Sequence, residues 1–289
     1  MALAIDGTPV VGTDTGGSSL TLTYASVSAG SILVVMAGSE RVTSAAAHAT
    51  ISVSSATLGS FSKRADGSID GVGQSSAFSY AGYWWACAPN ALTNEIITIE
   101  FSTTIDDAAG MAFAVSGFTG TAYQTNPWDQ NASLGQASLT TATILTTPHA
   151  AAISTTNANT MLLGICLGPF SGNLLASSPF TAIGVGNVKN SGGTNQFSGA
   201  MESNVVSTTQ TSLAVQIGDG SAVDTWMMWA DALSESGSGS SSPTDDRAFQ
   251  NGAVSLLLSM RERASGLLEP VRELWKPKKP KLFVPGFSF

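Results

Sequence analysis

Residues able to do chemistry are few in this chain and are widely spaced. The tripeptide Asp14-Thr15-Gly16 has the order that aspartic proteases use to bring two carboxylates together around one shared proton. The sequence has no second such tripeptide, and the flanking residues are Gly, Thr and Ser rather than the apolar residues that frame a buried carboxylate pair. We therefore expect a hairpin turn at this position.

Other catalytic and metal-binding patterns are equally weak. His48 and His149 are the only histidines, and no Gly-x-Ser-x-Gly motif accompanies them, which argues against a serine hydrolase. The histidines and cysteines are not at zinc-ligand spacing. The segment 66–71, DGSIDG, and the pair Asp106 and Asp107 have oxygens that suit calcium, but they fit polar turns better and lack EF-hand spacing. We predict a protein that is not an enzyme and has no cofactor.

Tryptophans offer a different chemistry, because exposed rings stack on sugars. Trp84 and Trp85 are adjacent, and Trp226 and Trp229 are three apart, so within a strand the members of each pair face opposite sides. One member of each pair is expected in a core. Trp128, in the loop sequence NPWDQ, is the best candidate for an exposed ring and for a glycan contact.

The cysteines, Cys87 and Cys166, each lie in an apolar run typical of a buried strand. Buried thiols are the expected state, and a disulfide would require the two strands to be neighbours.

The elements that must position these residues are strands. Short apolar or alternating runs separated by Gly, Ser, Asn and Pro recur through residues 1–233, for example Ile32–Met36 and NEIITIEFS at 94–102, and no convincing helix occurs before residue 245. This pattern predicts an all-β fold, an antiparallel two-sheet sandwich of jelly-roll type, with a closed barrel as the second choice. We see no repeat at a fixed period.

Charge is scarce and unevenly distributed. Charged residues make up 11% of the chain. Residues 1–246 contain four basic and seventeen acidic residues, whereas residues 247–289 contain eight basic and three acidic ones. An acidic body disfavours nucleic-acid binding by the main domain. The basic C-terminal part is suited to docking on an acidic surface, including a neighbouring copy.

The chain divides by composition into four parts. Residues 1–233 form the predicted β-sandwich domain, and residues 234–246 form a flexible Gly/Ser linker. Residues 247–275 follow as an amphipathic helical segment, which Gly266 and Pro270 interrupt, and residues 276–289 as an extended Pro/Lys-rich arm.

The C-terminal parts carry the predicted partner-binding residues. Apolar residues of the helical segment recur at heptad spacing and form one seam, and the arm adds aromatic residues. The seam is expected to pack on its own domain, on a neighbouring subunit or on a membrane surface. The residues assigned to partner binding are Leu257, Met260, Leu267, Val271, Leu274, Trp275, Leu282, Phe283, Phe287 and Phe289.

The middle of the chain resembles bacteriophage-associated sandwich proteins. The resemblance lies in YWWACAPNALTNEIITIEFSTTIDDAAGMAFAVSGFTG and, after a gap, NANTMLLGICLG, within residues 75–170. It implies a virion accessory component, such as a capsid decoration or tail protein, and it assigns no site residue.

These observations together favour a structural virion protein that assembles with copies of itself or with other virion proteins. The alternative is a carbohydrate-binding or host-adhesion module. The sequence has no apolar run of 18 residues for a membrane span, and MALAIDGTPVVG lacks the features of a signal peptide. We therefore expect synthesis in the host cytoplasm without export, and a final location in the virion.

Overall fold

A computed structural model describes residues 2–41, 49–70, 78–129, 135–139, 149–168, 174–183, 188–189, 197–219 and 226–236. All of them lie in one compact unit, Met1–Ser240. The predicted helical segment 247–275, the arm 276–289 and most of the linker lie outside the described residues. Every pairing between described strands is antiparallel, and the one helical element described is a 3-10 turn, η1 (Ala122–Gln124). The prediction of an all-β body is confirmed.

The described strands form four sheets. Sheet A has the order β1 (Ala4–Thr15), β9 (Asp107–Ser116), β3 (Ser31–Arg41), β7 (Phe78–Ala88), β6 (Ser62–Asp70). Sheet B has the order β2 (Ser19–Val27), β8 (Leu92–Phe101), β4 (Ile51–Ser55), β5 (Gly59–Ser60). Sheet C has the order β10 (Gly135–Leu139), β18 (Trp226–Ser234), β12 (Thr160–Gly168), β16 (Ser198–Val206), β14 (Thr181–Ala182), and β15 (Val188–Lys189) also pairs with β16. Sheet D has the order β11 (His149–Ile153), β17 (Leu213–Asp219), β13 (Leu174–Ala176).

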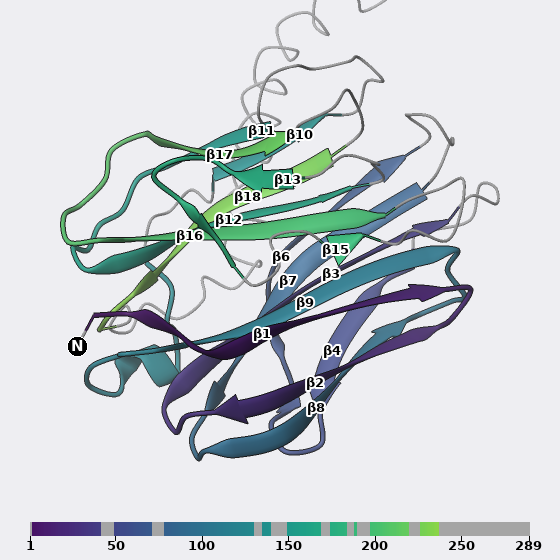
Figure 1. Ribbon diagram of the computed structural model, residues 1–289, viewed down its shortest axis with the longest axis horizontal. Coiled ribbons are helices and arrows are strands. Elements are labelled where there is room, and N and C mark those ends of the chain that lie inside the picture. The colour runs from purple at the N-terminus through teal and green to yellow at the C-terminus, as the bar shows by residue number, and fades with distance from the viewer. Residues whose placement is uncertain are drawn as a thin grey trace, which may run out of the picture. The chain divides into compact units, whose positions relative to one another are not determined.

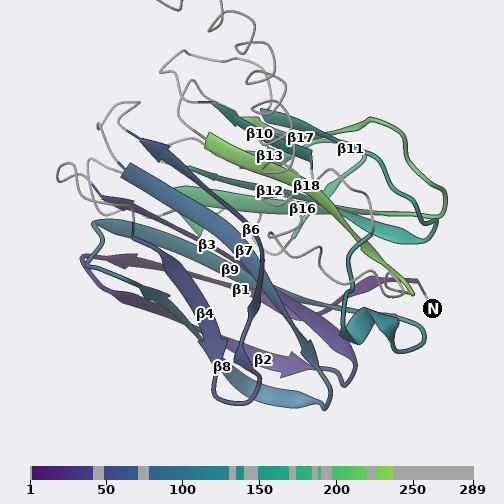
Figure 2. The same cartoon turned by 180° about the vertical axis from the view of Figure 1, so that it is seen from behind.

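The four sheets are stacked as layers in the order B, A, C, D (Figures 1 and 2). Three apolar cores fill the spaces between them. One core joins β2 and β8 of sheet B to β3 and β9 of sheet A. The second joins β3, β7 and β9 to β12, β16 and β18 of sheet C, and the third joins β12 and β18 to β11 and β17 of sheet D.

This layering explains two kinds of strand sequence. Strand β2 faces a core on one side only, so buried and exposed residues alternate along most of it. Strands β12 and β18 lie between two cores, and every residue of both is buried. An unbroken apolar run is therefore what a strand of an inner layer requires. The prediction of one two-sheet sandwich was wrong, because the body has two pairs of sheets packed on each other.

The two pairs of sheets share one strand order. Adding nine to the strand numbers of β1-β9-β3-β7 gives β10-β18-β12-β16, and adding nine to β2-β8-β4 gives β11-β17-β13. On the open side of β7, the first half has β6; on the same side of β16, the second half has β14 and β15. Strands β1 to β9 and strands β10 to β18 are therefore two versions of one unit, except that β5, which pairs with β4, has no counterpart beside β13 among the described strands.

The register of the strands supports this equivalence residue by residue. Ser31 opens β3 opposite Ala88 of β7, as Thr160 opens β12 opposite Val206 of β16. Backbone conformation agrees as well. Gly30 and Asn159, which precede these residues, have φ of 81° and 53°. Asn94 and Ser212, which occupy matching places before the cores of β8 and β17, have φ of 52° and 48°.

The body extends beyond the predicted boundary at residue 233. Ser234 is the last residue of β18 and is buried. The backbone N–H of Glu235 donates to the carbonyl of Asn159, and its carbonyl accepts from the N–H of Thr119.

Candidate functional site

A buried polar cluster joins the two halves between sheets A and C. Arg64 of β6 donates from Nε to Asp231 Oδ2 at 2.8 Å and from Nη2 to Oδ1 at 3.1 Å. Tyr83 of β7 donates its hydroxyl to Oδ2 of the same carboxylate at 2.7 Å. The Asp231 side chain is 4% exposed and that of Arg64 is 22% exposed. Sequence analysis did not find this pair because its members are 167 positions apart.

The surroundings keep the Arg64 guanidinium charged. Burial lowers the pKa of the Arg64 guanidinium, but the adjacent Asp231 carboxylate raises it more, so the pKa is higher than usual. Burial, and then the charge of Asp231, raise the pKa of the Tyr83 hydroxyl well above its usual value. The tyrosine therefore remains a hydrogen-bond donor rather than a base. The arrangement is suited to holding two sheets together.

Trp128 lies over this cluster and is not exposed. The residue is only 1% exposed, and the Arg64 guanidinium carbon is 4.9 Å from the centre of the indole. The rings of Tyr83 and Trp85 meet it edge-on, with centroids 5.7 and 6.5 Å away. A backbone bridge to Leu233 of β18 fixes the loop in place. The prediction of an exposed ring at Trp128 was wrong, and in this structure the ring has no free face for stacking on a sugar.

The other tryptophans follow their predicted faces. Trp84 lies in the core between sheets A and B, and Trp85 packs on the opposite side. Trp229 lies in the core between sheets A and C, and Trp226 in the core between sheets C and D. Trp226 faces a core rather than the surface because sheet C is covered on both sides.

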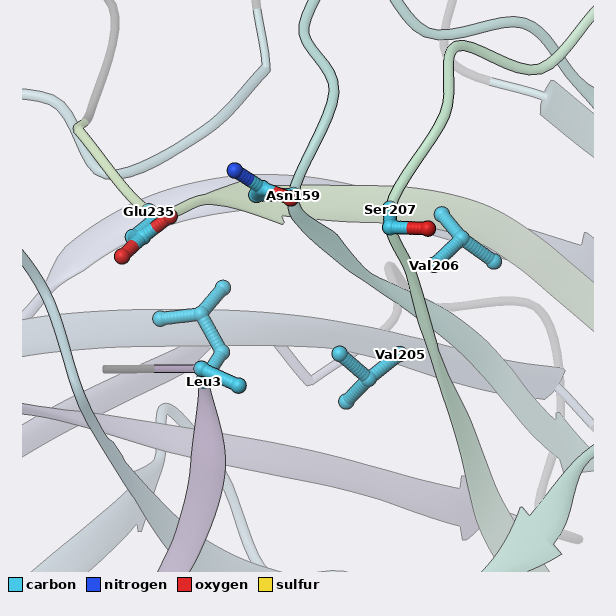
Figure 3. Close-up of a pocket in the computed structure, with 7 residues that line it drawn as sticks. Leu3, Asn159, Val205, Val206, Ser207 and Glu235 are labelled. Carbon is cyan, nitrogen blue, oxygen red and sulfur yellow. The ribbon is translucent and has the colours of Figure 1, made fainter.

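A groove of about 360 Å³ lies where the chain enters β1 and leaves β18 (Figure 3). Leu3, Val205 and Val206 give it an apolar wall, and Asn159, Ser207 and Glu235 give it a polar one. Val205 is 45% exposed, an unusual state for a large apolar residue of this body. The groove has the character of a contact surface rather than of an enclosed active site.

Glu202 is an ionisable group inside the second half. It lies on β16, is 0% exposed, and packs over Gly164 of β12. Its Oε2 accepts from the Ser177 N–H at 3.1 Å, whereas Oε1 has no hydrogen-bond partner. Burial raises the pKa of this carboxyl to about 7. At the matching place in the first half, Trp84 of β7 lies opposite Val35 of β3.

Two carboxylates hold equivalent turns in the two halves. Asp6 accepts from the Ser28 N–H at 2.7 Å and from the hydroxyls of Ser28 and Ser31 at 3.0 and 2.7 Å. Asp129 accepts from the N–H groups of Thr156 and Asn157 at 2.8 and 2.9 Å. Burial raises the pKa of Asp6, but the hydrogen bonds from the Ser28 backbone and from the serine hydroxyls outweigh it, so the pKa is lowered.

The residues that suggested catalysis or calcium are parts of structural elements. Asp14-Thr15-Gly16 ends β1 at a turn, as predicted, but β1 and β2 belong to different sheets, so the turn is not a hairpin. The DGSID sequence is part of β6 and not a turn, and Asp66 there accepts hydrogen bonds from Lys63 and Tyr80. No cluster of potential metal ligands occurs among the described residues.

Cys87 and Cys166 are thiols and not halves of a disulfide. Cys166 is buried, as predicted, whereas Cys87 is half-buried. Burial raises the pKa of the Cys87 thiol, which keeps it protonated at neutral pH.

The partner-binding residues predicted in the helical segment and the arm all lie outside the described part of the chain. No helix among the described residues is long and apolar enough to cross a membrane. Comparison with known proteins gives no match to any protein family, to any curated protein or to any solved structure.

Proposed function

We propose that this chain is a structural component of a phage virion, a capsid decoration or tail protein that assembles through its C-terminal helical segment and arm. The body would serve as a rigid block, and the C-terminal part would bind copies of the protein or other virion proteins.

The observation that carries the proposal is the strand order of each half. Eight-strand jelly rolls consist of two facing four-stranded sheets built from two Greek keys, and they are common in viral capsid and lectin domains. The orders β1-β9-β3-β7 and β2-β8-β4-β5 have this form, and β10-β18-β12-β16 with β11-β17-β13 repeats it. We assign a jelly roll to each half on this basis.

The polar groups of the interior support a structural role. Arg64, Asp231 and Tyr83 bind one another across two sheets, and Asp6 and Asp129 hold turns. Each of these groups is engaged in holding the body together. The charge contrast between the acidic body and the basic residues after position 246 favours contacts between copies.

The first test compares masses in solution by light scattering. One sample is the full chain, and the other is a chain ending at Ser240, which keeps the compact unit Met1–Ser240. We expect a defined oligomer from the first and a folded monomer from the second. Burial of an aromatic ring contributes about 1.5 to 3 kcal/mol before ordering costs, so several rings per arm suffice for stable contacts.

A matched variant separates the rings of the arm from its charge. Phe283→Ser, Phe287→Ser and Phe289→Ser together keep every lysine and remove three aromatic side chains. This variant is expected to be monomeric as well. Monomeric full-length protein would contradict self-assembly. In that case pull-down with other virion proteins and a glycan array decide between a different partner and the carbohydrate-binding alternative.

A further inference from the structure

The two halves contact each other reciprocally. Strand β6 of the first half lies against β18 of the second half. In the second half, β14 and β15 take the place of β6 beside β16, and β9 of the first half is the counterpart of β18. The matching contact is also present, because β15 lies against β9. Strands β3 and β12, which are counterparts of each other, also meet. In an isologous twofold interface, each unit uses the same surface, so every contact between two different elements occurs twice with the units exchanged. The contacts between the two halves have this pattern.

We propose that the body is a dimer of one repeated unit within a single chain, and that the Arg64–Asp231 ion pair determines which faces join. The proposal is independent of the virion function. In an isolated first half, the face of sheet A that packs on sheet C would be exposed. We assign one kind of partner to this face, a unit of the same fold with an acidic residue at the position of Asp231.

The two ends of the interface differ in chemistry. By register, Arg64 has no counterpart, because it is the extra residue of a bulge between Lys63 and Ala65. Ala65, opposite Tyr83, corresponds to Ile183, whose N–H donates to the carbonyl of Met201. Asp231 corresponds to Phe113, because β18 pairs with β12 at Leu163↔Asp231 as β9 pairs with β3 at Val34↔Phe113. One end therefore has an ion pair, and the related end has Phe113 of the apolar core in place of Asp231 and no residue in place of Arg64.

This difference disfavours the wrong pairings. If two first halves from different chains joined by the same faces, Arg64 would meet Phe113, which leaves a guanidinium buried without its carboxylate. If two second halves joined, Asp231 would meet β14, which has no residue at the place of Arg64, so the carboxylate would be left unpaired. An unpaired buried charge is strongly unfavourable, whereas the native pairing satisfies both ends.

The test is a double-mutant cycle in the full chain, followed by urea unfolding. The single variants are Arg64→Ile, which removes the guanidinium, and Asp231→Phe, which copies the residue of the related end, and the third variant combines them. Each single variant is expected to lower the folding equilibrium constant by roughly 10²- to 10³-fold. The double variant is expected to recover most of this loss, because no charge is then left alone.

A second readout reports the choice of partner. The variants are refolded at high protein concentration, and light scattering measures the fraction in which halves of different chains have joined. The double variant is expected to form more of these exchanged species than the native chain. A charge-reversed chain, Arg64→Asp with Asp231→Arg, is expected to remain a correctly paired body. Lys63→Met, which removes an exposed ion pair with Asp66, serves as the control and is expected to change neither readout.

Two results would overturn the proposal. In the first, losses from the two single variants simply add in the double variant, which means that the residues are not coupled. In the second, the double variant recovers stability but refolds with no more exchange than the native chain, which means that the pair stabilises the interface without selecting the partner.

Discussion

Glu202 is an ionisable residue at an interior position where the first half has Trp84. Its carboxyl has a pKa of about 7 in the folded protein, against 4.5 for an ordinary glutamate. Between these values the folded protein retains a proton that the unfolded chain has released, so stability falls as the pH rises through this window. Below pH 4.5 both states are protonated and the penalty disappears.

Replacing this carboxyl by an amide tests the argument. We expect Glu202→Gln to raise the free energy of unfolding by up to about 3 kcal/mol at pH 8 and to change it little at pH 4.5. Urea unfolding at the two pH values measures the difference. Glu100→Gln, at an exposed position of β8, is the control. Equal effects of Glu202→Gln at both pH values would show that Glu202 does not titrate inside the body.

The residue type predicted whether a side chain is buried or exposed only where the residue lies in a strand, because the strand fixes the face on which each side chain lies. The opposite faces of Trp84 and Trp85 followed from their adjacency in a strand. The prediction for Trp128 was wrong because NPWDQ has the polar composition of a surface loop. The burial of this ring depends on Arg64 and Tyr83, which come from distant strands. No local pattern reports such a contact.

At the scale of elements, the turns before β3 and β12 each depend on a carboxylate, Asp6 of β1 in the first half and Asp129, which precedes β10, in the second. Asp6→Asn is expected to lower the free energy of unfolding by about 1 to 2 kcal/mol at pH 7. Because the pKa of Asp6 is lowered, this contribution to stability is present above pH 4. It is lost as the pH falls below the pKa of an ordinary aspartate and through the lower pKa of Asp6. Urea unfolding at pH 7 and pH 3 measures both effects.

The neighbouring serine provides a graded comparison for the turn. Ser28→Ala removes the hydroxyl donor and keeps the backbone N–H, so it is expected to cost less than Asp6→Asn. An equal loss from Asp6→Asn at pH 3 and pH 7 would contradict an ionised carboxylate as the cause.

Close approach between sheets A and C also depends on a missing side chain. A Cβ added at Gly38 of β3 would lie 2.4 Å from two ring atoms of Phe197 and 3.0 Å from the Ala81 Cβ. Gly38→Ala is therefore expected to lower the free energy of unfolding by about 1 to 3 kcal/mol. Gly59→Asn, at a turn with φ of 72° and no atom within 4 Å, is the control and is expected to be nearly neutral. Wild-type stability of Gly38→Ala would mean that the sheets separate easily.

The elements themselves were the part of the fold that the sequence revealed best. Alternation in β8 and the unbroken apolar run in β3 reflect one covered face and two covered faces, respectively. The DGSID part of β6 was missed because its residues are typical of turns, and it is held as a strand by pairing with β7. Pairing partners come from distant sequence, so local propensity cannot supply them.

At the scale of the whole molecule, the sequence did not reveal the duplication. Equivalent positions have residues as different as Phe113 and Asp231, or Trp84 and Glu202, so no repeat can be seen in the letters. The repeat is visible only in strand order and register. What the two units share is the pattern of pairing, to which many side chains can contribute.

The shared core between sheets A and C predicts how the body unfolds. Because β3, β7 and β9 pack directly on β12, β16 and β18, loss of either half exposes the apolar face of the other. We expect a single calorimetric transition for the chain ending at Ser240, with equal calorimetric and van't Hoff enthalpies. A calorimetric enthalpy near twice the van't Hoff value would show that the halves unfold independently.

The position of β18 has a consequence for synthesis on the ribosome. This strand is the last of the body, yet it lies inside sheet C between β10 and β12 and supplies Trp229 to the core shared with sheet A. The first half is complete at Ser116, but the face of its sheet A that packs on sheet C is not fully covered until Ser234 has been made. At translation rates of about 5 to 20 residues per second, the nascent chain carries an uncovered apolar sheet face for roughly 6 to 24 seconds, long enough for a chaperone to bind it.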